Sequence, residues 1–326
     1  MEFDTTMDKS NFKEILRSVH EQVEEGIELS FEKKGHGEFK NIVIVGMGGS
    51  GLPGRLLQNY IKNIPVYVVQ EFAMQEFITK ESLVFIISYS GNTAETVDIY
   101  RKIGRTGIQT IVISSGGKLE ILAPMYKSPY IKIPTGEQPR MALTHMFFAM
   151  IGVLQNTGII QKQDKAIEQV KSVLNKDTYD DLAKQLAEKI GNKTPIIYTS
   201  PKYSFVGYKW KISFNENAKR MAFCNVVPEV AHNELAAYQT ANNHYYTIIL
   251  KSANDHPQIK QRMDALKIAI KKSGNQCLEM TIRGEETLCE LFSASYLADW
   301  VSYYCALAAG IDPTPVQVIE DFKKAL

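Results

Sequence analysis

A strand that ends in a turn of small hydroxyl residues most constrains the fold of this chain. Residues 83–87 are apolar, and Ser88-Tyr89-Ser90-Gly91-Asn92-Thr93 follows them directly. A helix that starts at this turn presents backbone N–H groups without intrahelical partners, together with a partial positive charge. Those groups, with the hydroxyls of Ser88, Ser90 and Thr93, are suited to bind a phosphate. The alternative is that Thr93 only caps the helix.

A second turn, rich in glycine, follows the apolar strand 41–45. It reads Gly46-Met47-Gly48-Gly49-Ser50-Gly51, and a helix is expected from about Leu52 to Ile61. The same glycines fit the G-x-G-x-x-G dinucleotide fingerprint, with Glu71 as a candidate to hold a ribose. Two phosphate-binding turns at strand ends of one sheet suit a compact phosphosugar better than a long dinucleotide. We therefore predict that Gly49 and Ser50 join the hydroxyl turn at a sugar phosphate.

Charge and hydropathy exclude several classes of protein. The chain has 37 basic and 36 acidic residues, a net charge of +1, so it has no field that would attract nucleic acid or a membrane surface. Its first residues lack the pattern of a signal peptide, and its most apolar stretch, 147–154, is too short to span a bilayer. The four cysteines show no C-x-x-C spacing, so no zinc or redox motif is indicated. A soluble cytoplasmic protein is predicted.

The order of the expected elements indicates an α/β fold. Beyond a helix over about 11–31, strands alternate with helix-length segments, which predicts parallel sheets covered on both faces. Strands are expected near Asn41, Pro65, Leu83, Gln109 and Pro129, and then at 195–198, 221–226, 245–250 and 276–280. Helices should fill 140–191. Because the turn at 200–204 repeats the strand-turn-helix arrangement of the first half, we predict two similar domains, 1–155 and 156–326.

Several motifs together resemble one enzyme family. They are G-M-G-G-S-G at 46–51, S-Y-S-G-N-T at 88–93, G-E-Q-P-R at 136–140, F-N-E-N-A-K at 214–219, P-E-V-A-H-N-E at 228–234 and the closing D-P-T-P-V with I-E-D-F-K. This set resembles the bifunctional phosphoglucose/phosphomannose isomerases of the sugar isomerase (SIS) superfamily. The resemblance implies two SIS domains, each with a five-stranded parallel sheet flanked by helices, and a homodimer with active sites at the subunit interface. It also implies no cofactor, no metal and a role in glycolysis and gluconeogenesis.

The residues supply the chemistry that interconversion of an aldose phosphate and a ketose phosphate needs. Glu216 resembles the family's carboxylate that moves a proton between C1 and C2, and such a group can take and return a proton. Arg140 resembles the cation that stabilises the enediolate, because a guanidinium favours spread negative charge. The alternatives are a solvated carboxylate at a helix end for Glu216 and a structural salt bridge to Glu137 or Glu229 for Arg140.

Ring opening is assigned through the resemblance to His232, which the family contributes across the dimer interface. An imidazole titrates near neutral pH, so it can hand a proton to the ring oxygen and recover it. His145 lies in an apolar segment where packing is the expected role. Lys323 resembles the lysine that supports ring opening, although Lys324 is adjacent and a solvated helix lysine is the alternative. Thr314 is a possible counterpart of the small hydroxyl residue that admits both C2 epimers, but its spacing leaves it unassigned.

Three other classes of protein compete with this interpretation. A non-catalytic sugar-phosphate-binding SIS protein or regulator could use the same turns, but it would not require Glu216, Arg140 and His232 together. The amidotransferase of hexosamine synthesis needs an N-terminal glutaminase with a leading cysteine, which this sequence does not contain. An NAD-dependent oxidoreductase stays open because of the glycine pattern, and titration with NADH would distinguish it.

Overall fold

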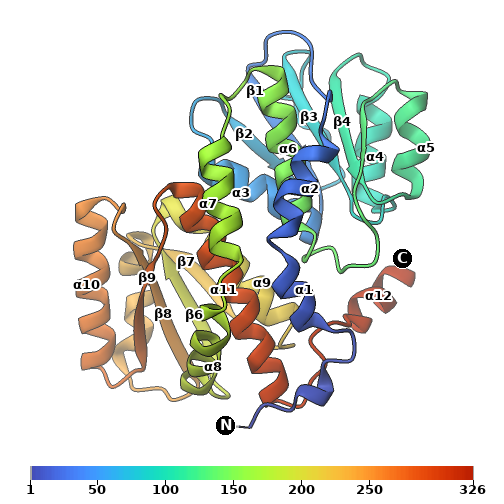
Figure 1. The fold of residues 1–326 in the computed structure, drawn as a ribbon. Helices are drawn as coiled ribbons and strands as arrows, with labels where there is room; N and C mark the ends of the chain where they lie inside the picture. The colour runs from blue at the N-terminus through green and yellow to red at the C-terminus, as the bar shows by residue number, and fades with distance from the viewer. Residues whose placement is uncertain (1, 326) are drawn as a thin grey trace. The chain divides into compact units, whose positions relative to one another are not determined.

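The computed structural model describes residues 2–325, which form two compact units (Figure 1). One unit comprises residues 18–171, here called the phosphate unit. The other comprises residues 2–17 and 172–325, here called the C-terminal unit. The division therefore falls inside helix α7 (Asp164–Leu174) and returns the N-terminal residues to the second unit. The domain boundary at 155/156 stays a prediction.

The phosphate unit is built on a parallel sheet of five strands in the order β2-β1-β3-β4-β5. The strands begin at the predicted positions. They are β1 (Asn41–Val45), β2 (Val66–Val69), β3 (Ser82–Ile87), β4 (Gln109–Ser114) and β5 (Tyr130–Lys132). This order has its switch point between β1 and β3, where the connections leave in opposite directions. In open parallel sheets, ligands bind beyond the carboxyl ends of the strands at such a point.

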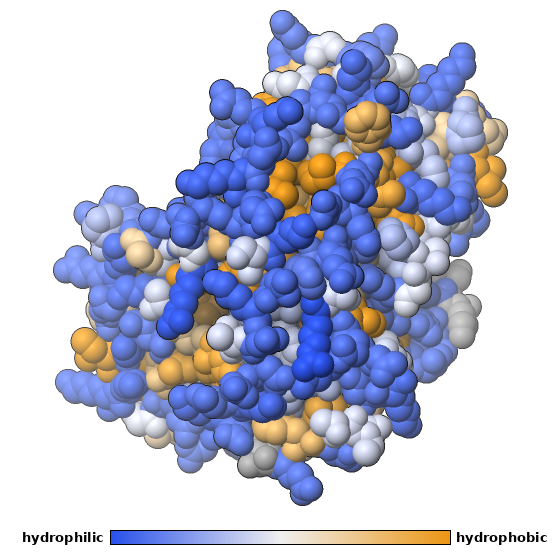
Figure 2. Space-filling model, in the orientation of Figure 1, coloured by the Kyte–Doolittle hydropathy of each residue, from blue (hydrophilic) through white to orange (hydrophobic). Residues whose placement is uncertain are grey.

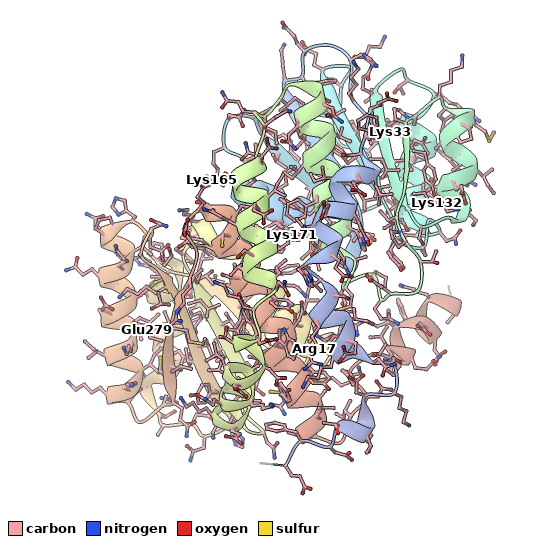
Figure 3. All side chains as sticks on the ribbon, in the orientation of Figure 1. Arg17, Lys33, Lys132, Lys165, Lys171 and Glu279 are labelled. Atoms are coloured by element: carbon pink, nitrogen blue, oxygen red, sulfur yellow. The ribbon has the colours of Figure 1, made fainter. Side chains whose placement is uncertain are left out.

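Helices cover both faces of this first sheet, as its unbroken apolar strands require. Val43 and Val45 of β1 pack with α4 (Ala94–Ile103) and α5 (Gly117–Met125) in one buried cluster. On the opposite face, α3 (Leu52–Tyr60) packs so closely on β1 that a Cβ at Gly54 of this helix would lie 2.9 Å from the Ile44 side chain. Behind α3, the apolar helix α6 (Leu143–Thr157) packs against α2 (Glu21–Leu29). Figure 3 shows Lys171 of α7 beside α2, where its Nζ lies 2.5 Å from Glu24 Oε2.

The C-terminal unit repeats the strand order with one strand fewer. Its parallel sheet runs β7-β6-β8-β9, formed by β6 (Thr194–Thr199), β7 (Phe223–Val226), β8 (Tyr245–Ser252) and β9 (Cys277–Ile282). The expected fifth strand is wrong for this unit. After β9 the chain enters α11 (Thr287–Ala308), a helix of 22 residues buried along nearly its whole length, and only a loop and α12 (Gln317–Lys324) follow. No segment remains in the described residues to extend the sheet beyond β9.

Helix α11 is the central helix of the C-terminal unit and packs against α8 (Thr178–Ile190) and α9 (Ser204–Glu216). On the other face, α10 (Pro257–Lys272) covers β8 and β9. Figure 3 labels Glu279 on β9, whose carboxylate lies 3.4 Å from Lys267 of α10. The single helix expected over 11–31 is instead two helices, α1 (Phe12–Ser18) and α2, with a break at 19–20.

The face drawn in Figure 2 is mainly hydrophilic, and its hydrophobic residues gather in several separate areas. Across residues 2–325, every helix is too short or too polar to cross a membrane.

Candidate active site

Two turns of the phosphate unit meet at the carboxyl ends of adjacent strands. β1 pairs with β3, so the glycine turn after Val45 and the hydroxyl turn after Ile87 emerge side by side. The buried Ser50 hydroxyl accepts a hydrogen bond from the Tyr89 N–H at 2.9 Å and so joins the two turns directly. Ser50 lies in the short 3₁₀ helix η2 (Gly48–Gly51), which leads straight into α3. The predicted neighbourhood of Gly49 and Ser50 with the second turn is therefore present.

In the hydroxyl turn, the side chain of the N-cap residue does not cap the start of α4. Thr93 occupies the N-cap position, but its side chain accepts no hydrogen bond from the first turn of α4. Its hydroxyl instead lies 2.8 Å from that of Ser88, which is fully buried. Ser90 is exposed, and its oxygen accepts a weak bond of 3.3 Å from the Asn92 N–H. The alternative that Thr93 only caps the helix is thus not what its side chain does, and the first N–H groups of α4 can serve an anion.

Two glycines allow the loops at this edge to approach one another. Gly91 has φ +67°, and a Cβ there would lie 1.7 Å from the carbonyl oxygen of Gly116 after β4. At Gly49, a Cβ would lie 2.7 Å from the backbone nitrogen of Arg140. Any side chain at these positions would push the loops apart. Glycine at 49 therefore sets the contact between the glycine turn and the loop that carries the candidate cation.

Arg140 is one of the largest fully buried side chains of the protein, with 1% of its surface exposed. It ends the loop 136–140 just before α6. The loop is tied to the hydroxyl turn because the Tyr89 phenol accepts a hydrogen bond from the Glu137 N–H at 2.9 Å. A permanently charged guanidinium in such a place needs a compensating anion or strong acceptors. Gln138 supplies one distant acceptor, at 3.5 Å from Nη1.

A half-buried acid, Glu137, stands in the same loop as Arg140. Both oxygens of Glu137 accept from the Gln22 amide of α2, at 3.0 and 3.2 Å. Burial raises the pKa of Glu137, and the neighbouring His145 opposes that rise. His145 itself is buried in α6, with Nε2 2.6 Å from Glu25 Oε2. The expected packing role of His145 is therefore accompanied by a polar contact that links α6 to α2.

In the C-terminal unit, the candidate base stands at the end of a helix. Glu216 is the last residue of α9 and is half-buried. The negative end of the helix dipole makes this an unfavourable place for a carboxylate unless a cation is near. Lys219 supplies one, because its Nζ lies 2.8 Å from the Glu216 carbonyl and 3.0 Å from the carbonyl of Pro313. Lys219 thereby connects the end of α9 to the closing D-P-T-P segment.

His232 is exposed in the single chain, at the end of the 3₁₀ helix η4 (Glu229–His232). Both acids of its motif have structural partners. Glu229 accepts from the Asn233 amide at 2.7 Å. Glu234 accepts from the hydroxyl of Tyr198 at 2.8 Å and from the amide of Asn225 at 2.6 Å. The two bonds of Glu234 hold the loop against β6 and β7.

The closing segment carries the two remaining candidates. Lys323 is exposed on α12. The side chain of Lys324, the alternative in the adjacent register, lies outside the described part of the chain. Thr314 has its N–H bonded to Asp312 Oδ1 at 3.0 Å, so a local turn shapes this stretch. Through Pro313, the segment meets the end of α9 that carries Glu216.

The strand ends of the C-terminal unit are filled by the protein's own carboxylates. Asp255 bonds the Ser200 hydroxyl after β6, and it accepts from the Ser252 N–H at the end of β8 at 2.7 Å. Glu290 of α11 accepts from the hydroxyls of Ser252, at 2.5 Å, and of Tyr203. In the C-terminal unit, an anion-binding site equivalent to the two turns of the phosphate unit would lie at these strand ends. Here the negative charge is already supplied from within.

The structure thus groups the predicted residues by unit. Gly49, Ser50, Ser88, Ser90, Thr93 and Arg140 lie on three joined loops of the phosphate unit. Sequence reasoning did not identify Tyr89 and Lys219 as the residues that hold these loops and the end of α9. Tyr89 and Lys219 belong to the motifs at 88–93 and 214–219, but their role in holding the loops follows only from their contacts with distant segments. Within the described residues, no cluster of three or more His, Cys, Asp or Glu side chains could hold a metal ion.

Two family models match the chain, one in each unit. Residues 38–151 match the SIS domain, and residues 179–326 match the bacterial phospho-glucose isomerase C-terminal SIS domain. The protein is 33% identical over 305 residues to a bifunctional phosphoglucose/phosphomannose isomerase of Caldicellulosiruptor bescii, covering 89% of this chain and 90% of that protein. It is 31% identical to the enzyme of the same name from Aquifex aeolicus, covering 88% and 91%.

One similar protein carries a different name. The D-glucosamine-6-phosphate 4-epimerase of Sulfolobus acidocaldarius is 30% identical, over 73% of this chain and 78% of that protein. Among solved structures, the C-terminal domain of glucosamine-fructose-6-phosphate aminotransferase from Francisella tularensis has a TM-score of 0.69 at 15% identity, covering 91% and 96%. A glucose-6-phosphate isomerase like protein from Thermus thermophilus has a TM-score of 0.62 at 15% identity, covering all of both chains. At such identities the structures establish the shared fold.

Proposed function

The chain belongs to the family of bifunctional phosphoglucose/phosphomannose isomerases, and from that premise we propose how its own residues carry out the reaction. It is an aldose–ketose isomerase that interconverts glucose 6-phosphate or mannose 6-phosphate with fructose 6-phosphate. The proposal assigns the phosphate to the first turn of α4, with Ser90, Thr93 and the glycine turn around it. One observation carries the proposal: two hydrogen bonds and a close backbone contact join the loops of Ser50, Tyr89 and Arg140. We call these three joined loops the cradle.

The catalytic steps need a proton donor, a base and a cation. His232 passes a proton to the ring oxygen to open the sugar, with Lys323 assisting. Glu216 then removes the proton from C2 of the aldose and returns it to C1 through a cis-enediolate. Arg140 stabilises the negative charge of that intermediate more than it stabilises the neutral sugar, which lowers the barrier.

The cradle explains why two epimers can be substrates. It recognises the phosphate, the end of the sugar far from C2, so that glucose and mannose phosphates are held alike. At C2 the two substrates differ only in the direction of one hydroxyl. The enediolate has no stereocentre at C2, so both aldoses reach one intermediate.

The proposed working form is a homodimer in the cytoplasm that needs no cofactor or metal. His232 is exposed in the single chain, at the surface where a partner could receive it. A symmetric dimer would place two such histidines at once, one for each site. Proton transfer through an enediolate is redox-neutral overall, so the reaction requires neither an electron carrier nor an external oxidant.

The first test is a coupled assay on fructose 6-phosphate, glucose 6-phosphate and mannose 6-phosphate, with the unphosphorylated sugars as controls. Both aldose phosphates should be substrates, and the free sugars should not. If glucose 6-phosphate alone reacts, the bifunctional assignment is wrong. Binding of the phosphates without turnover of any of them would favour the alternative, a non-catalytic SIS regulator.

The second test compares Glu216→Gln with the parent enzyme. Glutamine keeps the shape of the side chain but cannot accept the C2 proton, so kcat should fall by about 10²–10⁴ with little change in substrate binding. In heavy water the parent should incorporate deuterium at C1 or C2, and the variant should not. Exchange at the parental rate would assign the base to another group, such as Glu229.

A further inference from the structure

A row of polar side chains crosses the buried seam between α9 and α11. Lys209 of α9 lies with Nζ 2.5 Å from Asp299 Oδ1 of α11, and the Ser213 hydroxyl donates to the same carboxylate oxygen at 2.8 Å. One turn further along α9, the Asn217 amide donates to the Ser302 hydroxyl at 2.9 Å. We call these five residues the α9–α11 polar row.

Joining two helices through such a row costs free energy, because charged groups are removed from water. The side chains of Lys209 and Asp299 are only 1% and 10% exposed, so both charges are removed from water. The attraction within a buried ion pair seldom exceeds the cost of removing its charges from water, and well-packed apolar residues are often as stable or more so. Large apolar side chains are also present at the seam, because Trp210 and Phe214 of α9 are fully buried, and the Trp210 indole N–H donates to the Ala294 carbonyl of α11 at 2.9 Å. Stability alone therefore does not explain the row.

The row has the spacing that controls the rotation of a helix. Lys209 and Ser213 of α9 and the C-cap residue Asn217 stand at i, i+4 and i+8, so they form one stripe that continues to the end of the helix. Apolar contacts are non-directional, whereas hydrogen bonds have narrow distance and angle requirements. The three side-chain bonds from Lys209, Ser213 and Asn217 to α11 therefore set both the rotation of α9 about its axis and its position along α11. The last of these residues directly follows Glu216 in the chain.

We propose that the α9–α11 polar row positions Glu216 for proton transfer, an inference that rests on the proposed role of Glu216 as the base. Its five members are positioning residues and touch no substrate. With the row in place, the end of α9 takes one orientation and the Glu216 carboxylate one direction. With an apolar seam, the helices would still pack, but α9 could rotate or slide by a fraction of a turn. A displacement of about 1 Å at a reacting group can cost 10²-fold in rate.

The test replaces the ion pair by apolar residues of similar size, Lys209→Met with Asp299→Leu. We expect kcat to fall by about 10- to 100-fold, while KM and the inhibition constant of a phosphosugar analogue stay within about twofold. The melting temperature should be unchanged or higher. A structural role alone predicts the reverse pattern, with a lower melting temperature and an unaltered kcat in the folded protein.

Two further variants keep the result interpretable. Ile212→Val removes a buried methylene from the same helix outside the row, and it should lower the melting temperature with kcat unchanged. Ser302→Ala removes the acceptor of Asn217 and should lower kcat about 3- to 10-fold with KM unchanged, which decides the matter if the double variant does not fold. Parental kcat in the folded double variant, or in Ser302→Ala if the double variant does not fold, overturns the inference. Full activity of Glu216→Gln would instead overturn the proposed base and leave the row without its function.

Discussion

At the scale of single residues, the hydroxyl turn divides its side chains between structure and ligand. Ser88 and Ser50 are buried and hold the turns together, whereas Ser90 is exposed and Thr93 is half-buried beside the start of α4. The latter two are the hydroxyls best placed to reach a phosphate from solvent. Their contribution can be measured separately from the chemistry, because the phosphate takes no part in the reaction.

We predict that Ser90→Ala and Thr93→Ala raise KM and the inhibition constant of a phosphosugar analogue together, because each removes binding made equally in the ground and transition states. The expected loss is about 1.5–3 kcal/mol for each bond to the charged phosphate. Steady-state kinetics and calorimetric titration of the analogue give both constants. Unchanged binding of the analogue by the folded double variant would place the phosphate elsewhere.

Glu137 offers a test by pH. Burial raises its pKa above the ordinary value of 4.5. The folded protein therefore favours the neutral carboxyl of Glu137. The stability that this group contributes is fully present at a pH below its unfolded pKa, and it is lost as the pH rises through its folded pKa. Glu137→Gln stays neutral throughout. The melting temperature of the variant minus that of the parent should therefore increase as pH rises from about 4 to 8.

Scanning fluorimetry of the two proteins across this pH range checks the direction. The opposite trend, with Glu137→Gln losing stability relative to the parent at higher pH, would mean that ionised Glu137 is paired in the folded protein. That outcome would favour the structural salt bridge between Glu137 and Arg140 over a role for Arg140 in stabilising the enediolate.

At the scale of elements, the two sheets share a strand order but not a binding edge. The ends of β1 and β3 carry a glycine turn and a hydroxyl turn with the first N–H groups of α4 uncapped by Thr93. The matching ends of β6 and β8 carry Ser200 and Ser252, which are bonded to the carboxylates of Asp255 and Glu290. A phosphate at the second edge would have to displace these buried acids or lie against them.

We therefore predict one phosphosugar site per chain. Calorimetric titration with a phosphosugar analogue should give a stoichiometry of one, and Thr93→Ala with Ser90→Ala should weaken that single event. A second event that survives in the double variant would show that the edge of the C-terminal unit also binds phosphate. The carboxylates of Asp255 and Glu290 would then have to be protonated or displaced on binding.

At the scale of the whole molecule, the proposed exchange of His232 across a dimer can be tested by complementation. Glu216→Gln and His232→Ala should each be nearly inactive alone. In a mixed dimer, one site would combine an intact Glu216 from one chain with an intact His232 from the other. Co-refolding equal amounts should therefore restore about a quarter of the parental activity, because half of the dimers are mixed and each has one complete site.

Each homodimer, refolded alone, is the control for this experiment. If His232 acts within its own chain, a mixed dimer contains no complete site and the mixture stays inactive. Sedimentation or light scattering on the same samples establishes that dimers are present. A monomer with full isomerase activity would remove the need for the exchange.

Local patterns in the sequence predicted much of this protein. The strands of the first sheet are short runs rich in apolar residues. Glycine, serine or proline lies at or just after the end of β1, β3, β4 and β5, and Pro65 precedes β2, so their positions follow from neighbours in the chain. The phosphate turns also follow locally, because the N-terminus of a helix exposes the same backbone groups wherever it stands. The motifs at 46–51, 88–93 and 136–140 were recognisable for that reason, as was the family.

Contacts between distant segments decided the rest. The fifth strand that the resemblance implied for the C-terminal unit is absent from the described residues, where the local pattern had indicated four strands and the long buried helix α11 takes up the chain after β9. The sequence placed Gly49 in a phosphate-binding turn, but only the tertiary structure brings the backbone of Arg140, far along the chain, against it. The ion pair of Lys209 and Asp299 joins residues 90 positions apart, and each charge finds its partner in the interior only because α9 packs against α11. A sequence specifies which groups the chain carries, but a buried charge acquires its partner only when the tertiary structure brings two remote segments together.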